Sequence, residues 1–311
     1  MEVTIPDNSR PWPEEIERFL HHFSSMFTET ASSTAITPLE RYRFDLRGYL
    51  VLRNALSPEE VAACNRVLDS VPTMQRDDWW GWVREHGFGS KDGRNLQQIY
   101  EAGQPFEALI DHPAWIEKVK TFVGGQKSFD AHHGPLFIDE AFANLRGPGE
   151  AIGIHSGGHE GTKRTQFRFH NGQFHCGQIN ILMALSEIGP GDGATMVIPG
   201  SHKANFQHPH ADEHTIGKGG SLDAIEEAVE VHLHAGDVLL FVDAISHGSA
   251  RRVNPGERRI CVYRYGPSWG FFRHNYRPSP ELLARLTPER RKIVWPHGQP
   301  VTPPGAVANM I

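Results

Sequence analysis

The sequence predicts a mainly β fold, a sandwich or jelly roll with helices on either side of it. From Ser128 onward, short runs of β-prone residues alternate with clusters of Gly, Pro, Asn and Asp, a pattern typical of strands joined by turns. No helix-length segments alternate with these runs, which disfavours a parallel sheet. The predicted strands are Pro135–Asp139, Ile179–Leu185, Ala194–Ile198, Val229–Leu233, Val238–Val242 and Ile260–Tyr265.

Three helices are predicted before these strands. Residues Pro13–Phe27 carry apolar side chains at helical spacing. An apolar strand, Gly48–Leu52, is followed by Ser57–Glu60, in which serine and glutamate match a capping box and proline occupies the first helical turn, so a helix should begin there. Another helix should follow Asp111–Pro113 and end at the glycines that begin with Gly124.

The end of the chain returns to helix. Ser279 and Pro280 match an N-cap and first turn, and the apolar residues that follow predict one helix before Pro296. A short helical insertion is also expected at Leu222–Val229. We therefore expect an N-terminal tail and packing helix (1–40), a β domain (41–270) and a C-terminal helical extension (271–311).

Bulk composition restricts the class of protein. The 311 residues carry a net charge of −6, which disfavours a nucleic-acid surface because phosphate binding needs clustered Lys and Arg. The three cysteines are far apart, so neither a disulfide framework nor a zinc knuckle is indicated. No signal peptide or spanning segment is recognisable. We expect a soluble, cytoplasmic protein that binds neither nucleic acid nor membrane; its oligomeric state has no sequence signal.

One aromatic cluster stands out. Trp79, Trp80 and Trp82 crowd a segment that also holds charges and two glycines. Exposed tryptophan is unfavourable unless it covers something. The cluster is therefore either a small local core under a long loop or a wall of a substrate pocket for an organic, partly apolar molecule.

Chemistry is indicated most clearly in the stretch His234–Tyr265. Two apolar runs, Val238–Val242 and Ile260–Tyr263, are each preceded by turn residues, which predicts a hairpin-like return. His247 and Arg258 lie on the connection, 11 positions apart. An imidazole suits a metal and a guanidinium suits a carboxylate, so the two side chains could converge on one bound group.

These residues resemble the phytanoyl-CoA dioxygenase family of iron(II)- and 2-oxoglutarate-dependent oxygenases. The His-Gly-Ser of residues 247–249 with Arg258, the segment Gly189–Lys203, and the segment Gly48–Glu60 match three family motifs in order and spacing. The resemblance covers roughly residues 40–270. It implies a double-stranded β-helix (jelly-roll, cupin-like) core, and iron(II), 2-oxoglutarate and dioxygen as the reacting partners of a small-molecule substrate.

The resemblance also implies a metal site, with one departure. In the family, a His-x-Asp motif and a distal histidine hold the iron; here His155 and His247 match the histidines, but Gly157 stands in place of aspartate. Because residues two apart on an extended chain point to one side, the family's pair can come from one strand. Glu160 is our first substitute ligand. The alternatives are an open position at Gly157 filled by water, or chloride bound there as in the related halogenases.

The remaining site residues are expected on the cosubstrate side. The resemblance assigns Arg258 to the far carboxylate of 2-oxoglutarate, and a buried arginine needs an anion in any case. Ser249, two positions past His247, is expected to add a hydroxyl to that carboxylate. Gln178, Asn180 and, less directly, Thr195 are polar residues on predicted inward strand faces, which suits the cosubstrate or substrate pocket.

We therefore expect a dioxygenase that hydroxylates an unactivated C–H bond of a small organic substrate and releases succinate and carbon dioxide. A halogenase that uses chloride at the Gly157 gap is the second hypothesis. A third belongs to another class: a non-catalytic module, or a cupin-like protein that holds another metal through His155, His159 and His247.

Overall fold

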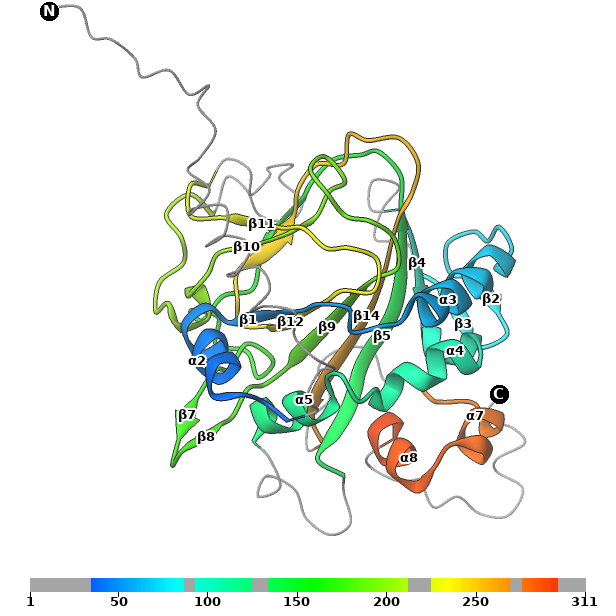
Figure 1. Ribbon diagram of the computed structural model, residues 1–311, viewed down its shortest axis with the longest axis horizontal. Coiled ribbons are helices and arrows are strands. Elements are labelled where there is room, and N and C mark those ends of the chain that lie inside the picture. Colours follow the sequence, from blue (N-terminus) through cyan, green and yellow to red (C-terminus); the bar gives the residue numbers. More distant parts are fainter. Residues whose placement is uncertain (1–34, 87–92, 125–133, 212–224, 269–275, 296–311) are drawn as a thin grey trace, which may run out of the picture. The chain divides into compact units, whose positions relative to one another are not determined.

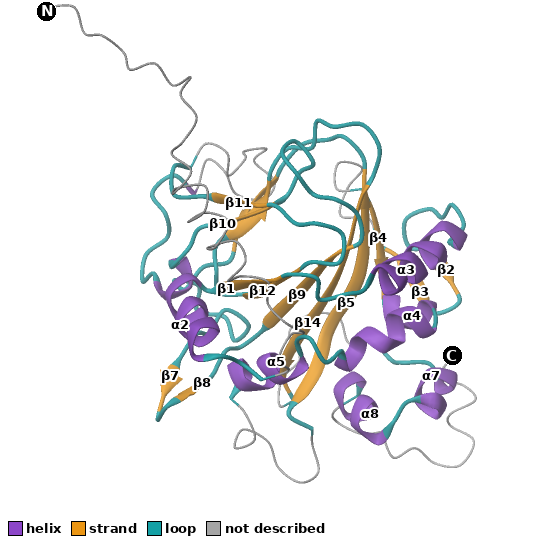
Figure 2. Cartoon of the chain, viewed as in Figure 1, coloured by secondary structure: helices purple, strands orange, loops and turns teal. Residues whose placement is uncertain are grey.

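Two antiparallel sheets form the framework of the computed structural model, which describes residues 35–86, 93–124, 134–211, 225–268 and 276–295 (Figures 1 and 2). The larger sheet has eight strands in the order β1-β12-β9-β14-β5-β4-β3-β2. Their bounds in that order are Tyr49–Leu52, Val238–Val242, Ile179–Ala184, Arg258–Pro267, Leu136–Arg146, Arg94–Gln97, Val83–Glu85 and Trp79–Trp80.

The smaller sheet has four strands in the order β11-β10-β13-β6. They are Val229–Val231, Thr195–Val197, His247–Ser249 and Ile152–His155, and a separate hairpin joins β7 (Phe169–His170) to β8 (Gln173–Phe174). From β5 to β14 the chain passes back and forth between the two main sheets, with β10 and β11 following one another in the smaller sheet. Two antiparallel sheets connected in this way agree with the jelly roll that the strand pattern predicted.

The predicted hairpin between Val238–Val242 and Ile260–Tyr263 is wrong. Strand β12 pairs with β1 and β9, whereas β14 pairs with β9 and β5, so β9 separates the two strands. The intervening residues His247–Ser249 do not form a loop but strand β13 of the smaller sheet. A local sequence pattern cannot distinguish two strands that pair as a hairpin from two strands that are separated by a strand of a second sheet.

Helices flank the larger sheet at α2 (Pro38–Arg47), α3 (Pro58–Ser70), α4 (Gln104–Glu107), α5 (Ile116–Val123), α7 (Pro280–Arg285) and α8 (Pro288–Val294). Single-turn 3-10 helices occur at η1 (Ile99–Ala102), η2 (Ala108–Asp111) and η4 (Ser201–Lys203). The Ser57 capping box is formed as predicted, and α5 ends at Gly124. In the described part of the chain, no helix is both long and apolar enough to cross a membrane.

Three of the predicted helices are not found as predicted among the described residues. The segment Pro13–Phe27 lies outside the described residues. Of the helical insertion expected at Leu222–Val229, the first three residues also lie outside, and the rest is not helical: Ile225–Ala228 forms a turn and Val229 begins β11. The single C-terminal helix is instead two helices. The Thr287 side chain accepts a hydrogen bond from the Arg290 backbone and caps α8, and Pro288 disfavours helical geometry at the residue before it.

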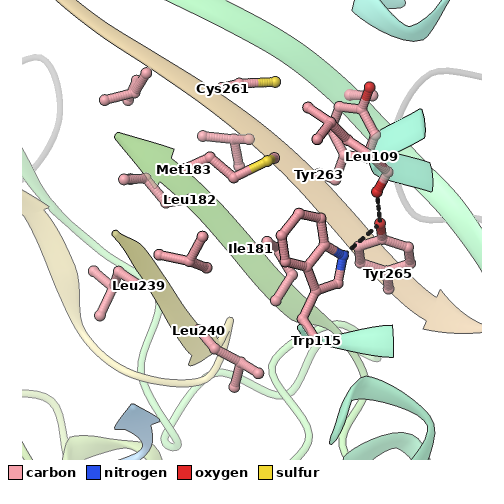
Figure 3. Packing of buried hydrophobic residues seen from close by; sticks show 14 of the residues in the cluster. Leu109, Trp115, Ile181, Leu182, Met183, Leu239, Leu240, Cys261, Tyr263 and Tyr265 are labelled. Carbon is pink, nitrogen blue, oxygen red and sulfur yellow. Dashed lines mark hydrogen bonds between the residues drawn. The ribbon is translucent and has the colours of Figure 1, made fainter. Parts of the chain in front are cut away.

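The two faces of the larger sheet differ in chemistry. Tyr263 and Tyr265 on β14 point to one face, where Figure 3 shows them with Trp115 and Leu109 from the helical layer. The Tyr265 hydroxyl accepts a hydrogen bond from Trp115 Nε1 (3.3 Å) and lies 3.0 Å from the Ile110 carbonyl oxygen. Residues of opposite parity, among them Arg258 and Arg264, point to the other face. That face therefore carries the polar groups.

Replacing Tyr265 with phenylalanine should lower the free energy of unfolding by about 1–3 kcal/mol, because the buried Trp115 N–H loses its acceptor. Tyr100→Phe is the matched control, since Tyr100 is also buried and its hydroxyl makes no hydrogen bond within the described residues. Urea unfolding of the two variants should separate them. Equal losses of stability would mean that ring packing, rather than the hydrogen bond, holds the helices to the sheet.

Candidate active site

Two histidines lie side by side in the smaller sheet. His247 at the start of β13 is the register partner of His155 at the end of β6, and their ring centroids are 4.0 Å apart. Directly opposed residues of antiparallel strands project from the same face. Although 92 positions separate them in the sequence, the pairing of two short strands brings both imidazoles to one place.

Backbone carbonyls fix the orientation of both rings. His155 Nδ1 lies 3.1 Å from the Gly153 carbonyl oxygen, and His247 Nδ1 lies 2.7 Å from that of Ile245. Because a carbonyl oxygen can only accept, each Nδ1 carries the proton and each Nε2 keeps a free lone pair. Burial, followed by the neighbouring His247, holds the pKa of His155 well below its usual range, and burial lowers the pKa of His247 to about 4. Both rings are therefore neutral, which is the form that binds a metal.

The third ligand position has no carboxylate at residue 157, and the backbone explains why one would not fit. Strand β6 ends at His155, and the next two residues have positive φ, +61° at Ser156 and +148° at Gly157. The extended geometry that would place residues 155 and 157 on one side is therefore absent. Among the described residues, no group of three His, Cys, Asp or Glu side chains is arranged to hold a metal ion.

Glu160, the expected substitute, is engaged elsewhere. Its carboxylate lies 3.6 Å from Arg164, whose guanidinium also contacts Asp243 at 2.5 Å. Glu160 nonetheless lines the same cavity as His155. Its role as a ligand stays a prediction, and it would require the ion pair with Arg164 to open.

Asp243 is a site residue that the sequence analysis missed. It is fully buried directly after β12, accepts a hydrogen bond from Asn180 Nδ2 at 3.1 Å, and acts to raise the pKa of both His155 and His247. The available signal was a carboxylate that immediately follows an apolar run and precedes His247 by four positions.

The two polar residues predicted for this strand, Gln178 just before β9 and Asn180 on it, are also hydrogen-bonded to carboxylates. Asn180 binds Asp243, and Gln178 Nε2 donates to Asp139 at 2.8 Å. Both side chains are completely buried. Within the described residues, their amide oxygens make no hydrogen bond, so each retains a free acceptor.

Arg258 lies on the polar face of β14 and is 2% exposed. Its guanidinium donates to the Gly193 carbonyl and, at 2.9 Å, to Asn144 Oδ1. Within the described residues it forms no ion pair, and its Nε has no hydrogen-bond partner. Burial, and then the nearby guanidiniums of Arg146 and Arg252, lower the pKa of Arg258 to about 9. A bound anion would oppose this lowering of the pKa, because it favours the charged guanidinium.

Arg146 is a second residue that the sequence analysis missed. It is the register partner of Arg258 on β5, so the two guanidinium groups leave the sheet side by side. Arg146 donates a hydrogen bond to Ser249 Oγ at 2.7 Å. The available signal was an arginine at the end of a segment rich in β-prone residues, Leu136–Arg146, which is buried along its whole length.

Ser249 connects this cationic pair to the histidines, because it lies on β13 two residues after His247. Its Oγ accepts hydrogen bonds from Arg146 and from the Ile152 backbone, at 3.1 Å. The Ser249 hydroxyl group donates no hydrogen bond to any described residue. Thr195 is the register partner of Ser249 on β10. These predicted cosubstrate residues therefore do lie in one region.

A cavity of about 240 Å³ opens beside His155. Seven of its nine lining residues have polar side chains: Ile154, His155, Ser156, His159, Glu160, Gln207, His208, Ala211 and Ser246. Trp79 and Trp80 lie instead on β2 at the far edge of the larger sheet, and Trp82 follows in the turn to β3. None of the three lines this cavity, so the substrate-wall hypothesis for them stays a prediction.

Replacing Asp243 with asparagine should lower the free energy of unfolding by about 3 kcal/mol, because Arg164 and Arg264 would lose a buried counter-charge. Asp45→Asn removes a carboxylate that pairs with Lys203 at the surface, and should cost less than about 1 kcal/mol. Urea unfolding compares the two variants. A small loss for Asp243→Asn would show that the buried network is not needed for folding.

Comparisons with known proteins agree with this geometry. The family model for phytanoyl-CoA dioxygenase (PhyH) matches residues 44–260. The dioxygenase sphC of Aspergillus fumigatus is 23% identical over 281 residues, 87% of this chain and 72% of the relative. The dioxygenase cdmD of Talaromyces verruculosus is 28% identical over 123 residues, but the match spans only 37% of this chain and 35% of the relative.

Two solved structures share the fold. HygX from Streptomyces hygroscopicus, crystallised with nickel and 2-oxoglutarate, has a TM-score of 0.62 at 24% identity, covering 80% of this chain and 94% of HygX. SnoK, an α-ketoglutarate-dependent carbocyclase of nogalamycin biosynthesis, has a TM-score of 0.52 at 17% identity, covering 84% of this chain and 95% of SnoK. With the family match over most of the β domain, these findings show that the chain belongs to the phytanoyl-CoA dioxygenase family of iron(II)- and 2-oxoglutarate-dependent oxygenases.

Proposed function

We propose that this protein hydroxylates an unactivated C–H bond of a small organic molecule, with iron(II) held by His155 and His247 and 2-oxoglutarate held by Arg258. The observation that carries the proposal is the pairing of two neutral imidazoles, whose Nε2 atoms are free, with a buried arginine that has no carboxylate partner in the described residues. The first feature suits a divalent metal and the second suits an anion.

The chain's own residues fit both groups. His155 and His247 present neighbouring lone pairs from rigid strands, and Nδ1 hydrogen bonds prevent ring rotation. Arg258, with Ser249 and Arg146 beside it, would bind the far carboxylate of 2-oxoglutarate and so set the distance from that carboxylate to the histidines. Asn180 and Gln178 keep free amide oxygens deeper in the same face.

When bound, iron and 2-oxoglutarate supply the oxidising chemistry. One dioxygen molecule is consumed: one oxygen atom enters succinate as carbon dioxide leaves, and the other becomes the hydroxyl of the product. The polar side chains that line part of the cavity beside His155 support a substrate that carries hydrogen-bonding groups. HygX, which shares the fold, has been crystallised with a small molecule, hygromycin B, bound beside nickel and 2-oxoglutarate.

Arg258→Ala should weaken 2-oxoglutarate binding by about 10²-fold or more, because truncating one partner of a buried charge pair typically costs about 2–5 kcal/mol. Arg259→Ala is the control: the adjacent arginine points away from the site and pairs with Asp69 and Glu257 at 2.7 and 2.8 Å. Calorimetric titration of 2-oxoglutarate into metal-loaded protein, with dioxygen excluded, measures both. Equal affinities in wild type and Arg258→Ala would disprove the cosubstrate assignment.

A halogenase is the second candidate, because Gly157 supplies no ligand and leaves a position that an anion could take. The outcomes differ in product mass and in chloride dependence. Hydroxylation predicts incorporation of one labelled oxygen atom from ¹⁸O₂ and the same product yield with or without chloride. A product that contains chlorine, formed only when chloride is present, would establish the second candidate instead.

A further inference from the structure

The larger sheet presents a row of polar side chains beside the histidine pair. Asn180, Arg264 and Glu140 are register partners on β9, β14 and β5, so their side chains leave the same face next to one another. Phe241 on β12 continues this row as the register partner of Asn180, and its ring centroid lies 5.0 Å from that of His247. The row therefore lies on the face of the larger sheet that is turned toward the metal-binding histidines.

The next row on this face is apolar, and solvent reaches it. Phe142, Val262 and Leu182 are register partners on β5, β14 and β9, two positions along from the polar row and so on its side of the sheet. They are 8%, 4% and 5% exposed. Their chain neighbours Tyr263 and Met183, which point to the helical layer, are completely buried. A space that admits solvent therefore borders this face, and its floor beside the polar row is apolar.

The guanidinium of Arg264 reaches this space. Its side chain is 13% exposed, although Tyr263 and Tyr265 on either side of it are completely buried. The guanidinium lies over the Phe142 ring, with Cζ 5.5 Å from the ring centroid. It makes no hydrogen bond with any described residue; Nε and Nη1 are shielded from solvent, whereas Nη2 is not. Nη2 can therefore donate to a ligand that lies on the apolar row.

The charge of Arg264 is already balanced by its neighbours. Its Nε lies 3.2 Å from Glu140 Oε2 and its Nη1 lies 3.9 Å from Asp243 Oδ1, while Asp243 pairs with Arg164 at 2.5 Å. Two carboxylates and two guanidiniums therefore lie together. A ligand carboxylate would approach the two carboxylates and an ammonium would approach the two guanidiniums, and like charges brought together are unfavourable. A neutral oxygen atom can accept a hydrogen bond from Nη2 without changing this balance.

We propose that Arg264 Nη2 donates a hydrogen bond to a neutral oxygen atom of the substrate, in a hydroxyl, carbonyl or ether group, while the apolar body of the substrate lies on the row that contains Phe142. This inference rests on the proposed function and names the chemistry of its substrate. Arg258, which is assigned to the cosubstrate, lies six positions earlier on β14, or about 20 Å along the strand. The two arginines divide this face into a cosubstrate end and a substrate end.

Three small molecules with the same ring test this chemistry: cyclohexanol is neutral, cyclohexanecarboxylate is anionic and cyclohexylammonium is cationic. Each is added to the full-length protein loaded with manganese(II) and 2-oxoglutarate, and NMR measures how strongly the metal relaxes its protons, with zinc(II)-loaded protein as the diamagnetic blank. Manganese relaxes only protons that come near it, so the measurement reports binding beside the histidines without turnover. Cyclohexanol should bind about tenfold more tightly than either charged molecule.

Two substitutions of Arg264 should weaken the binding of cyclohexanol. Arg264→Met removes the hydrogen-bond donor and should weaken binding about tenfold. Arg264→Lys keeps a positive charge beside Glu140, which protects the fold, but it lacks Nη2 and should weaken binding about threefold or more. Arg259→Lys is the matched control and should leave binding unchanged, because Arg259 points to the other face and pairs with Asp69 and Glu257.

Tighter binding of a charged molecule, equal binding of cyclohexanol in wild type and both Arg264 variants, or no relaxation by manganese for any of the three molecules would overturn the inference. The charge-transfer band of iron(II) and 2-oxoglutarate is recorded on the same proteins without dioxygen. Loss of that band in Arg264→Lys would assign Arg264 to the metal or the cosubstrate and would also overturn the inference. A band that is absent from the wild type would overturn the proposed function itself.

Discussion

The register between β6 and β13 is the constraint on which the site depends. These two short strands place His155 opposite His247, and a shift of one residue would turn one imidazole to the other face of the sheet. The same strand β13 carries Ser249, which contacts Arg146 on the larger sheet. One three-residue strand therefore connects the metal-binding face to the cationic pair.

A polar interior is the second feature that organises the molecule. The face of the larger sheet toward the helices is apolar, and the opposite face carries Arg258, Arg146, Arg264 and Glu140. Burying charged groups is unfavourable unless they are paired or bind something. Glu140 lies 3.2 Å from Arg264, but Arg258 has only neutral acceptors among the described residues. The positive charge of Arg258 is therefore not neutralised by a described residue, and a bound dianionic cosubstrate would neutralise it.

Most of the central strands were predictable because alternation and turn residues are local signals, and the resemblance to the family supplied His155 and His247 as candidate ligands, whereas the order of the strands in the sheets was not predicted. Contacts between segments that are distant in the sequence could not be predicted. Asp243 was not recognised because its neighbours, Arg164 and Asn180, lie 79 and 63 positions away. Arg146 was missed because its relation to Arg258 arises from β5–β14 pairing. The positive φ angles at Ser156 and Gly157 likewise carried no clear signal, so an extended chain there was a reasonable expectation that proved wrong.

The central claim is that one site holds both iron and 2-oxoglutarate. The most direct measurement is the visible charge-transfer band that forms when iron(II) and 2-oxoglutarate bind together, recorded without dioxygen for wild type, Arg258→Ala and His247→Ala. The account predicts a band in the wild type that is lost in His247→Ala and needs much higher 2-oxoglutarate in Arg258→Ala. The absence of a band in the wild type, or a band unchanged in both variants, would contradict the account.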